Sequence, residues 1–181
     1  PIARPLERRD MIAWAQPGTG KTAAYLLPII NRLSRGEGDP KKVNAVIMAP
    51  PRELAIQIEQ QVEGFAYFLP VSSVAIYGGT DGIAWEQQRR GMALGAEIVI
   101  ATPGRLLALM NLQQADLSGV TYFVLDEADR MLDMGFQEDI MQINNALPKD
   151  CQRVMFSATM PPKIKKFART ILHNPAEVEL A

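Results

Sequence analysis

The chain has 181 residues, a net charge of −1 and one cysteine, and 48% of its residues are hydrophobic. This composition is typical of a folded globular domain and excludes a largely disordered chain. The lone Cys151 excludes an internal disulfide and a multi-cysteine metal site. Because the charge is balanced, any nucleic-acid role requires a local basic patch.

Short apolar runs alternate with helical patterns along the sequence. In chain order, the expected strands cover 11–15, 43–48, 74–77, 98–101, 122–125, 153–156 and 178–180. Apolar residues at helical spacing predict helices over 21–33, 54–65, 104–110, 140–147 and 164–172. Within the first helix, Pro28 removes one helical hydrogen bond and predicts a kink or an early stop.

This alternation predicts an α/β fold with a mostly parallel central sheet. Parallel strands need crossover connections, and nearly continuous apolar strands indicate that helices cover both faces of the sheet. We expect residues 1–181 to form a single domain. Ligands of such sheets bind at the carboxyl ends of the strands, and the glycine-rich and polar segments of this sequence fall there.

The first of these segments has the features of a phosphate-binding loop. It follows an expected strand and opens an expected helix, so its glycines let backbone N–H groups turn toward a phosphate at the helix N-terminus. Lys21 is expected to contact phosphate oxygens, and the Thr22 hydroxyl is expected to bind Mg²⁺. The alternative is an ordinary strand–turn–helix corner. The expected nucleotide-binding residues are Gln16, Gly18, Thr19, Gly20, Lys21 and Thr22.

An acidic cluster follows the expected strand at 122–125. Asp126 is placed to hold Mg²⁺, partly through water, and so to complete the metal site that Thr22 begins. Glu127 is placed to orient or deprotonate an attacking water. The two acids and Lys21 are therefore the expected catalytic residues. The alternative is an acidic N-cap of the next helix.

With these residues in view, the chain resembles the DEAD-box RNA helicases over nearly its whole length. Residues 126–129 read Asp-Glu-Ala-Asp, and residues 157–159 read Ser-Ala-Thr, which resembles the motif that links nucleotide state to unwinding. The resemblance implies the first RecA-like domain, with a P-loop, ATP and Mg²⁺. It also implies that Ser157 and Thr159 hydrogen-bond to the acidic motif at Asp129.

Three further segments resemble the RNA-backbone contacts of that family. Each lies just after a strand or at a helix start, where backbone N–H groups bind phosphates without reading bases. The alternative for each segment alone is ordinary turn and cap chemistry. The implied RNA-binding residues are Arg52, Glu53, Gly78, Gly79, Thr102, Pro103, Gly104 and Arg105.

The sequence departs from the family pattern at several positions. Pro51 and Pro17 stand where the family usually has threonine, and no glutamine follows Pro1-Ile2 to read adenine. The resemblance also implies a second RecA-like domain that supplies arginines to the γ-phosphate and half of the RNA clamp. Since residues 1–181 do not include it, we expect this chain alone to bind nucleotide, hydrolyse it slowly and not unwind RNA.

Two other functions remain open from the sequence. One is a P-loop ATPase of another class, such as a DNA translocase or a remodelling motor. The other is a non-enzymatic RNA-binding module that keeps the fold. No apolar run approaches the roughly 18 residues of a membrane span, and the first ten residues lack a long apolar stretch. We therefore expect a monomeric, cytoplasmic protein with no membrane partner.

Overall fold

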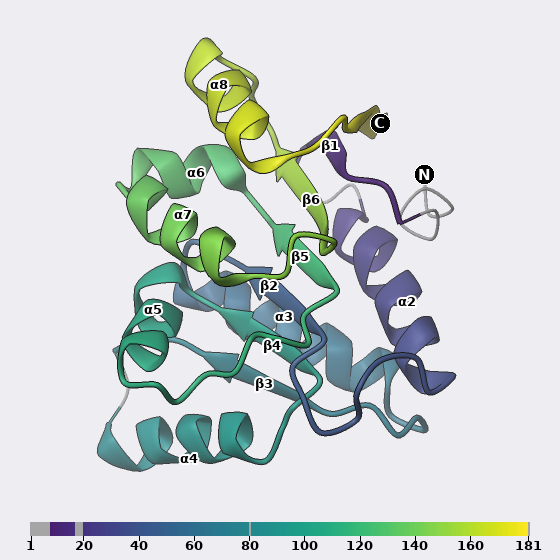
Figure 1. Ribbon diagram of the computed structural model, residues 1–181, viewed down its shortest axis with the longest axis vertical. Helices are drawn as coiled ribbons and strands as arrows, with labels where there is room; N and C mark the ends of the chain where they lie inside the picture. The colour runs from purple at the N-terminus through teal and green to yellow at the C-terminus, as the bar shows by residue number, and fades with distance from the viewer. Residues whose placement is uncertain (1–7, 17–19, 80, 181) are drawn as a thin grey trace.

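The computed structural model describes residues 8–16, 20–79 and 81–180. A central sheet carries helices on both faces (Figure 1). The strands are β1 (Met11–Ala15), β2 (Ala45–Met48), β3 (Ser73–Ile76), β4 (Ile98–Ala101), β5 (Tyr122–Leu125), β6 (Gln152–Ser157) and β7 (Ala176–Leu180). The helices are α2 (Lys21–Ser34), α3 (Arg52–Phe65), α4 (Gly82–Ala93), α5 (Pro103–Asn111), α6 (Ala128–Asp133), α7 (Gln137–Ala146) and α8 (Pro162–Ile171).

Within the described residues the sheet has seven strands in the order β3-β4-β2-β5-β6-β1-β7. Every neighbouring pair is parallel. The chain moves from β1 outward to β3, reverses, and returns through β4, β5 and β6. Since crossovers are right-handed, the two directions of travel place their helices on opposite faces.

Two hydrophobic cores result, one on each face of the sheet. Side chains of a strand alternate between the faces, so Val46 and Met48 of β2 join the core under α4 to α8, while Ala45 and Ile47 join the core under α2 and α3. All four of these side chains are 0% exposed. The parallel α/β architecture and both-faced helical cover predicted from the sequence are thereby confirmed.

The observed elements differ from the expected ones in three ways. Helix α2 continues through Pro28 to Ser34, so the early stop is wrong. Pro28 and the apolar residues after it are buried against the sheet, which offsets one missing backbone donor. Helix α4 was not expected, because it buries only Gln88 and Met92 and carries no continuous apolar stripe. Helix α6 has only 6 residues, too few for a periodic pattern.

Among the helices of the described residues, none is both long enough and apolar enough to cross a membrane.

Candidate nucleotide and nucleic-acid site

The described residues of the segments singled out from the sequence lie at the carboxyl edge of the sheet. The strand order divides them into two groups, because β5, β6 and β1 are neighbours and so are β3, β4 and β2. We call the first group the phosphate half; it contains residues 16, 20–25, 126–130 and 157–159. We call the second the arginine half; it contains residues 51–55, 77–79 and 102–105 together with Trp85.

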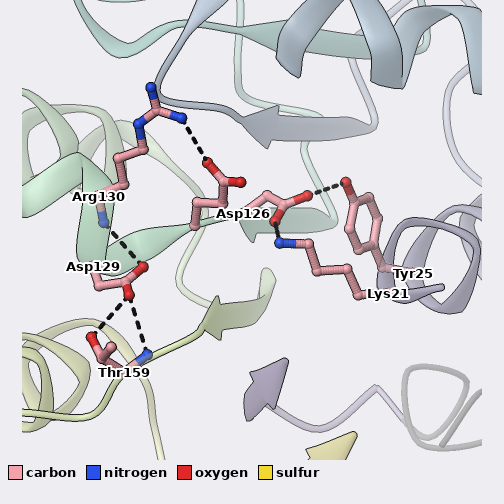
Figure 2. Close-up of polar contacts among 7 residues, drawn as sticks. Lys21, Tyr25, Asp126, Asp129, Arg130 and Thr159 are labelled. Atoms are coloured by element: carbon pink, nitrogen blue, oxygen red, sulfur yellow. Dashed lines mark hydrogen bonds and ion pairs between the residues drawn. The ribbon is translucent and has the colours of Figure 1, made fainter. Parts of the chain in front are cut away.

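Lys21 and Asp126 form a buried ion pair in the phosphate half. Lys21 Nζ lies 2.8 Å from Asp126 Oδ1, and the two side chains are 9% and 0% exposed (Figure 2). Gly20 precedes Lys21 with φ of 74°, the left-handed conformation that glycine adopts without strain. The structure therefore brings the start of α2 and the end of β5 together, as the sequence analysis expected.

The rest of the expected phosphate loop is only partly described. Gly18 and Thr19, and the unusual Pro17, lie outside the described residues. Gln16 is exposed, and its Nε2 donates to the Ala158 carbonyl oxygen at 3.3 Å. Gln16 thus connects the end of β1 to the segment after β6.

Tyr25 holds the second oxygen of Asp126. Its hydroxyl donates to Asp126 Oδ2 at 2.8 Å, and the ring is 1% exposed. Burial raises the pKa of Tyr25 well above its ordinary value, and the neighbouring Asp126 carboxylate raises it further. A side-chain hydrogen bond from Thr22 acts in the opposite direction. Tyr25 therefore stays protonated and remains a donor near neutral pH.

Glu127 has a strained backbone and an unsatisfied carboxylate oxygen. Its φ and ψ are 56° and 52°, a left-handed conformation that is costly for a residue with a side chain. Among the described residues, its buried Oε2 atom has no hydrogen-bond partner. The guanidinium of Arg130 lies 3.6 Å from this atom as an ion pair. A buried acceptor of this kind is typical of a site that takes a water or a ligand.

Asp129 connects the acidic motif to the segment after β6. Its Oδ2 accepts bonds from the Thr159 hydroxyl at 2.9 Å and from the Thr159 N–H at 3.2 Å (Figure 2). Its Oδ1 accepts from the Arg130 N–H at 3.0 Å. The expected contact is present for Thr159, but the one expected for Ser157 is wrong. The Ser157 hydroxyl donates instead to the Thr159 carbonyl at 2.7 Å, which fixes the turn after β6.

The phosphate half fits a magnesium nucleotide better than a free metal ion. Among the described residues no three His, Cys, Asp or Glu side chains gather into a metal site. Mg²⁺ bound with a nucleotide needs only one or two protein oxygens, because phosphates and water supply the rest. Thr22 and Asp126 offer that number, and Lys21 offers charge for the phosphates.

Two arginines from different helices meet the glycine pair in the arginine half. Arg52, the first residue of α3, donates to the Gly79 carbonyl at 2.9 Å. Arg105, in the first turn of α5, lies close to Gly78, where an added Cβ would be 3.5 Å from its terminal nitrogen. The three segments that resemble RNA-backbone contacts therefore form one continuous surface.

Aromatic rings support both arginines. The Arg52 guanidinium lies 5.3 Å from the Tyr77 ring centre, and the Arg105 guanidinium lies 4.2 Å from that of Trp85. Such cation–π contacts restrict a long side chain while leaving its N–H groups available. The Tyr77 N–H in turn donates to the buried Gln88 side chain at 3.0 Å.

The remaining residues of the arginine half lie at helix starts. Glu53 is exposed in the first turn of α3, whose N-cap is Pro51. Thr102 is the N-cap of α5, with Pro103 buried behind it and Gly104 exposed. Neither N-cap side chain bonds to the first-turn N–H groups of its helix within residues 51–55 and 102–106. The first-turn backbone N–H groups of α3 and α5 are therefore suited to bind an anion.

Three aromatic residues of this edge were not predicted from the sequence. Tyr25 lies three positions after Thr22, so helical spacing places it on the same side of α2 as that residue. Tyr77 immediately precedes the glycine pair, which is a weaker signal. Trp85 had no signal, because its contact with Arg105 joins two helices, α4 and α5, that no local sequence pattern relates.

Comparisons with known proteins agree with this geometry. The sequence profile of the DEAD/DEAH box helicases matches residues 2–167. Among curated relatives, "ATP-dependent RNA helicase DBP2" of Scheffersomyces stipitis is 42% identical over 181 residues, covering 97% of this chain and 33% of the relative. "DEAD-box ATP-dependent RNA helicase 21" of Oryza sativa is 40% identical over 197 residues, covering 97% of this chain and 26% of the relative.

A solved structure supports the same grouping. The crystal structure of a DEAD box protein from Methanococcus jannaschii superposes with a TM-score of 0.87 at 34% identity. The match covers 97% of this chain and 46% of that protein. The chain therefore spans a third or less of these two curated relatives and about half of this structural relative.

Proposed function

The chain belongs to the DEAD/DEAH box helicase family, and on that premise we propose that it is the first RecA-like, ATP-binding domain of an ATP-dependent RNA helicase. The observation that carries the proposal is the buried contact of Lys21 with Asp126, 2.8 Å apart, at the edge where α2 begins. Together with the unsatisfied oxygen of Glu127, it supplies the charges that ATP hydrolysis needs.

Each residue of the phosphate half has a role in this proposal. Lys21 exchanges its contact with Asp126 for contacts with the β- and γ-phosphates. Thr22 and Asp126 would hold Mg²⁺, which would neutralise phosphate charge. Glu127 orients a water and accepts its proton at the carboxylate as the water attacks the γ-phosphorus, while the bond from that phosphorus to the β,γ-bridging oxygen breaks and ADP leaves with that oxygen. Asp129 and Thr159 transmit the nucleotide state to the rest of the chain.

The arginine half is proposed to bind single-stranded RNA through its backbone. Arg52, Arg105 and the N–H groups at the starts of α3 and α5 are donors for phosphates and carry no base readout. The affinity is therefore expected to be independent of sequence and to fall steeply with salt.

A second RecA-like domain is proposed to complete the enzyme. The chain covers only 33% of one curated relative and 46% of the structural relative, so both proteins are much longer than it. Arginines that stabilise the transferred phosphoryl group are worth about 10³–10⁵ in rate when a partner domain supplies them. The 181-residue chain is thus expected to bind nucleotide while hydrolysing it slowly.

Calorimetry with Mg-ADP tests the nucleotide assignment. The wild-type chain is expected to bind, and Lys21→Ala is expected to lose binding. That variant also leaves the Asp126 carboxylate buried without a cation, which costs about 3–5 kcal/mol of stability. The double variant Lys21→Met/Asp126→Asn removes both charges and separates misfolding from lost binding. Lys149→Ala, at an exposed lysine just before β6, is the control that keeps binding.

Binding that survives the loss of Lys21 would contradict the assignment. Absence of Mg-ADP binding by the wild type would favour the non-enzymatic RNA-binding module.

A competition between single-stranded RNA and DNA of one sequence, with a non-hydrolysable ATP analogue present, tests the nucleic-acid assignment. RNA is expected to compete better, and a preference for DNA would favour another class of P-loop ATPase.

A further inference from the structure

Tyr25 contacts one of the residues assigned to Mg²⁺ and lies one helical turn after the other. Its hydroxyl donates to Asp126 Oδ2 at 2.8 Å, and Thr22 stands three positions earlier in α2. Tyr25 and Asp126 are 1% and 0% exposed, so no water competes for these bonds. One phenol oxygen thus connects a residue of α2 with a residue after β5.

We propose that Tyr25 is a positioning residue that holds Asp126 in place beside α2, the helix that carries Thr22, and thereby sets the affinity of the site for Mg²⁺ with nucleotide. The inference rests on the proposed function, since it concerns the same metal residues. It goes further, because Tyr25 touches neither nucleotide nor metal and acts only through its hydroxyl.

The bonds around Asp126 favour this role. Lys21 Nζ lies 2.8 Å from Oδ1 of Asp126, and the Tyr25 hydroxyl holds Oδ2 (Figure 2). When Lys21 turns to a phosphate, the Tyr25 hydroxyl still donates to the Asp126 carboxylate and restrains it. A restrained carboxylate loses less rotational freedom when it binds a cation or its water.

The ring of Tyr25 has a separate, structural task. It packs against Phe156 with ring centres 5.3 Å apart, inside the core under α2 and α3. Tyr25→Phe keeps that ring and removes the hydroxyl alone. The substitution therefore separates metal positioning from core packing.

Tyr122 offers a matched control. Like Tyr25, it is a buried tyrosine whose hydroxyl connects α2 with β5, here by a hydrogen bond from Arg32. It lies at the first residue of β5, at the opposite edge of the sheet from the site. Tyr122→Phe thus removes a comparable buried bond without reaching the metal residues.

The test measures ADP affinity by calorimetry with Mg²⁺ and with EDTA, for the wild type and both variants. The ratio of the two affinities reports the contribution of the metal. In Tyr25→Phe this ratio is expected to fall about three- to tenfold, with the metal-free affinity unchanged, because a hydrogen bond to a charged group is lost. In Tyr122→Phe the ratio is expected to stay within about twofold of the wild type.

An unchanged ratio in Tyr25→Phe, or an equal fall in both variants, would overturn the inference while leaving the proposed function in place. Absence of Mg-dependent binding in the wild type would instead remove the proposed function.

A second measurement does not depend on the folding of a variant. With the 4 tyrosines of the chain ring-labelled for NMR, Mg-ADP is expected to shift Tyr25 more than metal-free ADP does. Equal Tyr25 shifts in the two titrations would contradict the role.

Discussion

Glu127 is the residue whose geometry departs furthest from an ordinary helix start. Its left-handed backbone, with φ of 56°, and its buried Oε2 atom, which has no hydrogen-bond partner among the described residues, are both unfavourable for folding alone. Local strain of this kind persists where a functional site needs a side chain in one direction. The arrangement is explained if the carboxylate faces a water that it must deprotonate.

Glu127→Gln is therefore expected to separate binding from hydrolysis. The amide keeps the size of the side chain and loses its basicity, so Mg-ATP affinity is expected to stay within about twofold while turnover falls at least about a hundredfold. Single-turnover hydrolysis of labelled ATP, with the chain in excess, measures both quantities. Unchanged turnover would remove Glu127 from the reaction.

Cys151 is expected to be chemically inert in the folded chain. Burial raises the pKa of its thiol to about 12. At pH 8 only about one molecule in ten thousand would then carry the reactive thiolate. Labelling by a thiol reagent is expected only after urea unfolds the chain, whereas fast labelling of the native chain would show that the thiol is accessible.

At the scale of elements, helices α3, α4 and α5 together build the arginine half. α3 and α5 present Arg52 and Arg105 from their first turns, and α4 supplies Trp85 to support Arg105. Loop positions would leave such long side chains mobile. Helix starts and stacked rings hold them in place before a ligand arrives.

Substitution of Arg105 and substitution of its supporting ring, Trp85, are expected to weaken RNA binding in two distinguishable ways. Arg105→Ala removes a phosphate contact, so the slope of log affinity against log salt is expected to decrease by about one. Trp85→Leu keeps the charge and removes the stacking, so affinity is expected to fall about two- to fivefold at an unchanged slope. Fluorescence anisotropy with a labelled RNA at several salt concentrations measures both effects.

Arg169→Ala, at an exposed position on α8, is the control for general charge and is expected to leave RNA affinity nearly unchanged. An equal loss in this variant and in Arg105→Ala would mean that the arginine half has no specific role.

At the scale of the whole molecule, the strand order decides which functional segments become neighbours at the carboxyl edge of the sheet. Strand identity and the parallel arrangement could be predicted from apolar runs, because the inner strands β2, β4, β5 and β6 are buried on both faces. The edge strand β7 exposes Glu177 and Glu179. The convergence of the start of α2 with the residues after β5 followed from the rule that strand ends meet at one edge. The direct ion pair of Lys21 with Asp126 was not predicted. The order β3-β4-β2-β5-β6-β1-β7 could not be predicted, since it depends on long-range pairing that no local pattern encodes.

Local sequence patterns do not encode contacts between distant segments, and this explains the two errors at the site, the Ser157 bond and the missed Trp85. The Ser157 bond was misplaced because a hydroxyl two residues from Thr159 can close its own turn instead of reaching Asp129. Trp85 was missed because its partner Arg105 comes from a different crossover. Helix α4, which carries Trp85, has a mainly polar sequence with little periodicity.

We propose that one edge of the sheet binds two ligands, one on each of its two neighbouring halves. Amide chemical-shift mapping of the 181-residue chain tests it directly. Mg-ADP is expected to shift the amides of 20–25, 126–130 and 157–159, and single-stranded RNA those of 52–55, 77–79 and 102–105. If both ligands shifted the same residues, or if either shifted mainly the opposite edge of the sheet, the division into a phosphate half and an arginine half would be wrong.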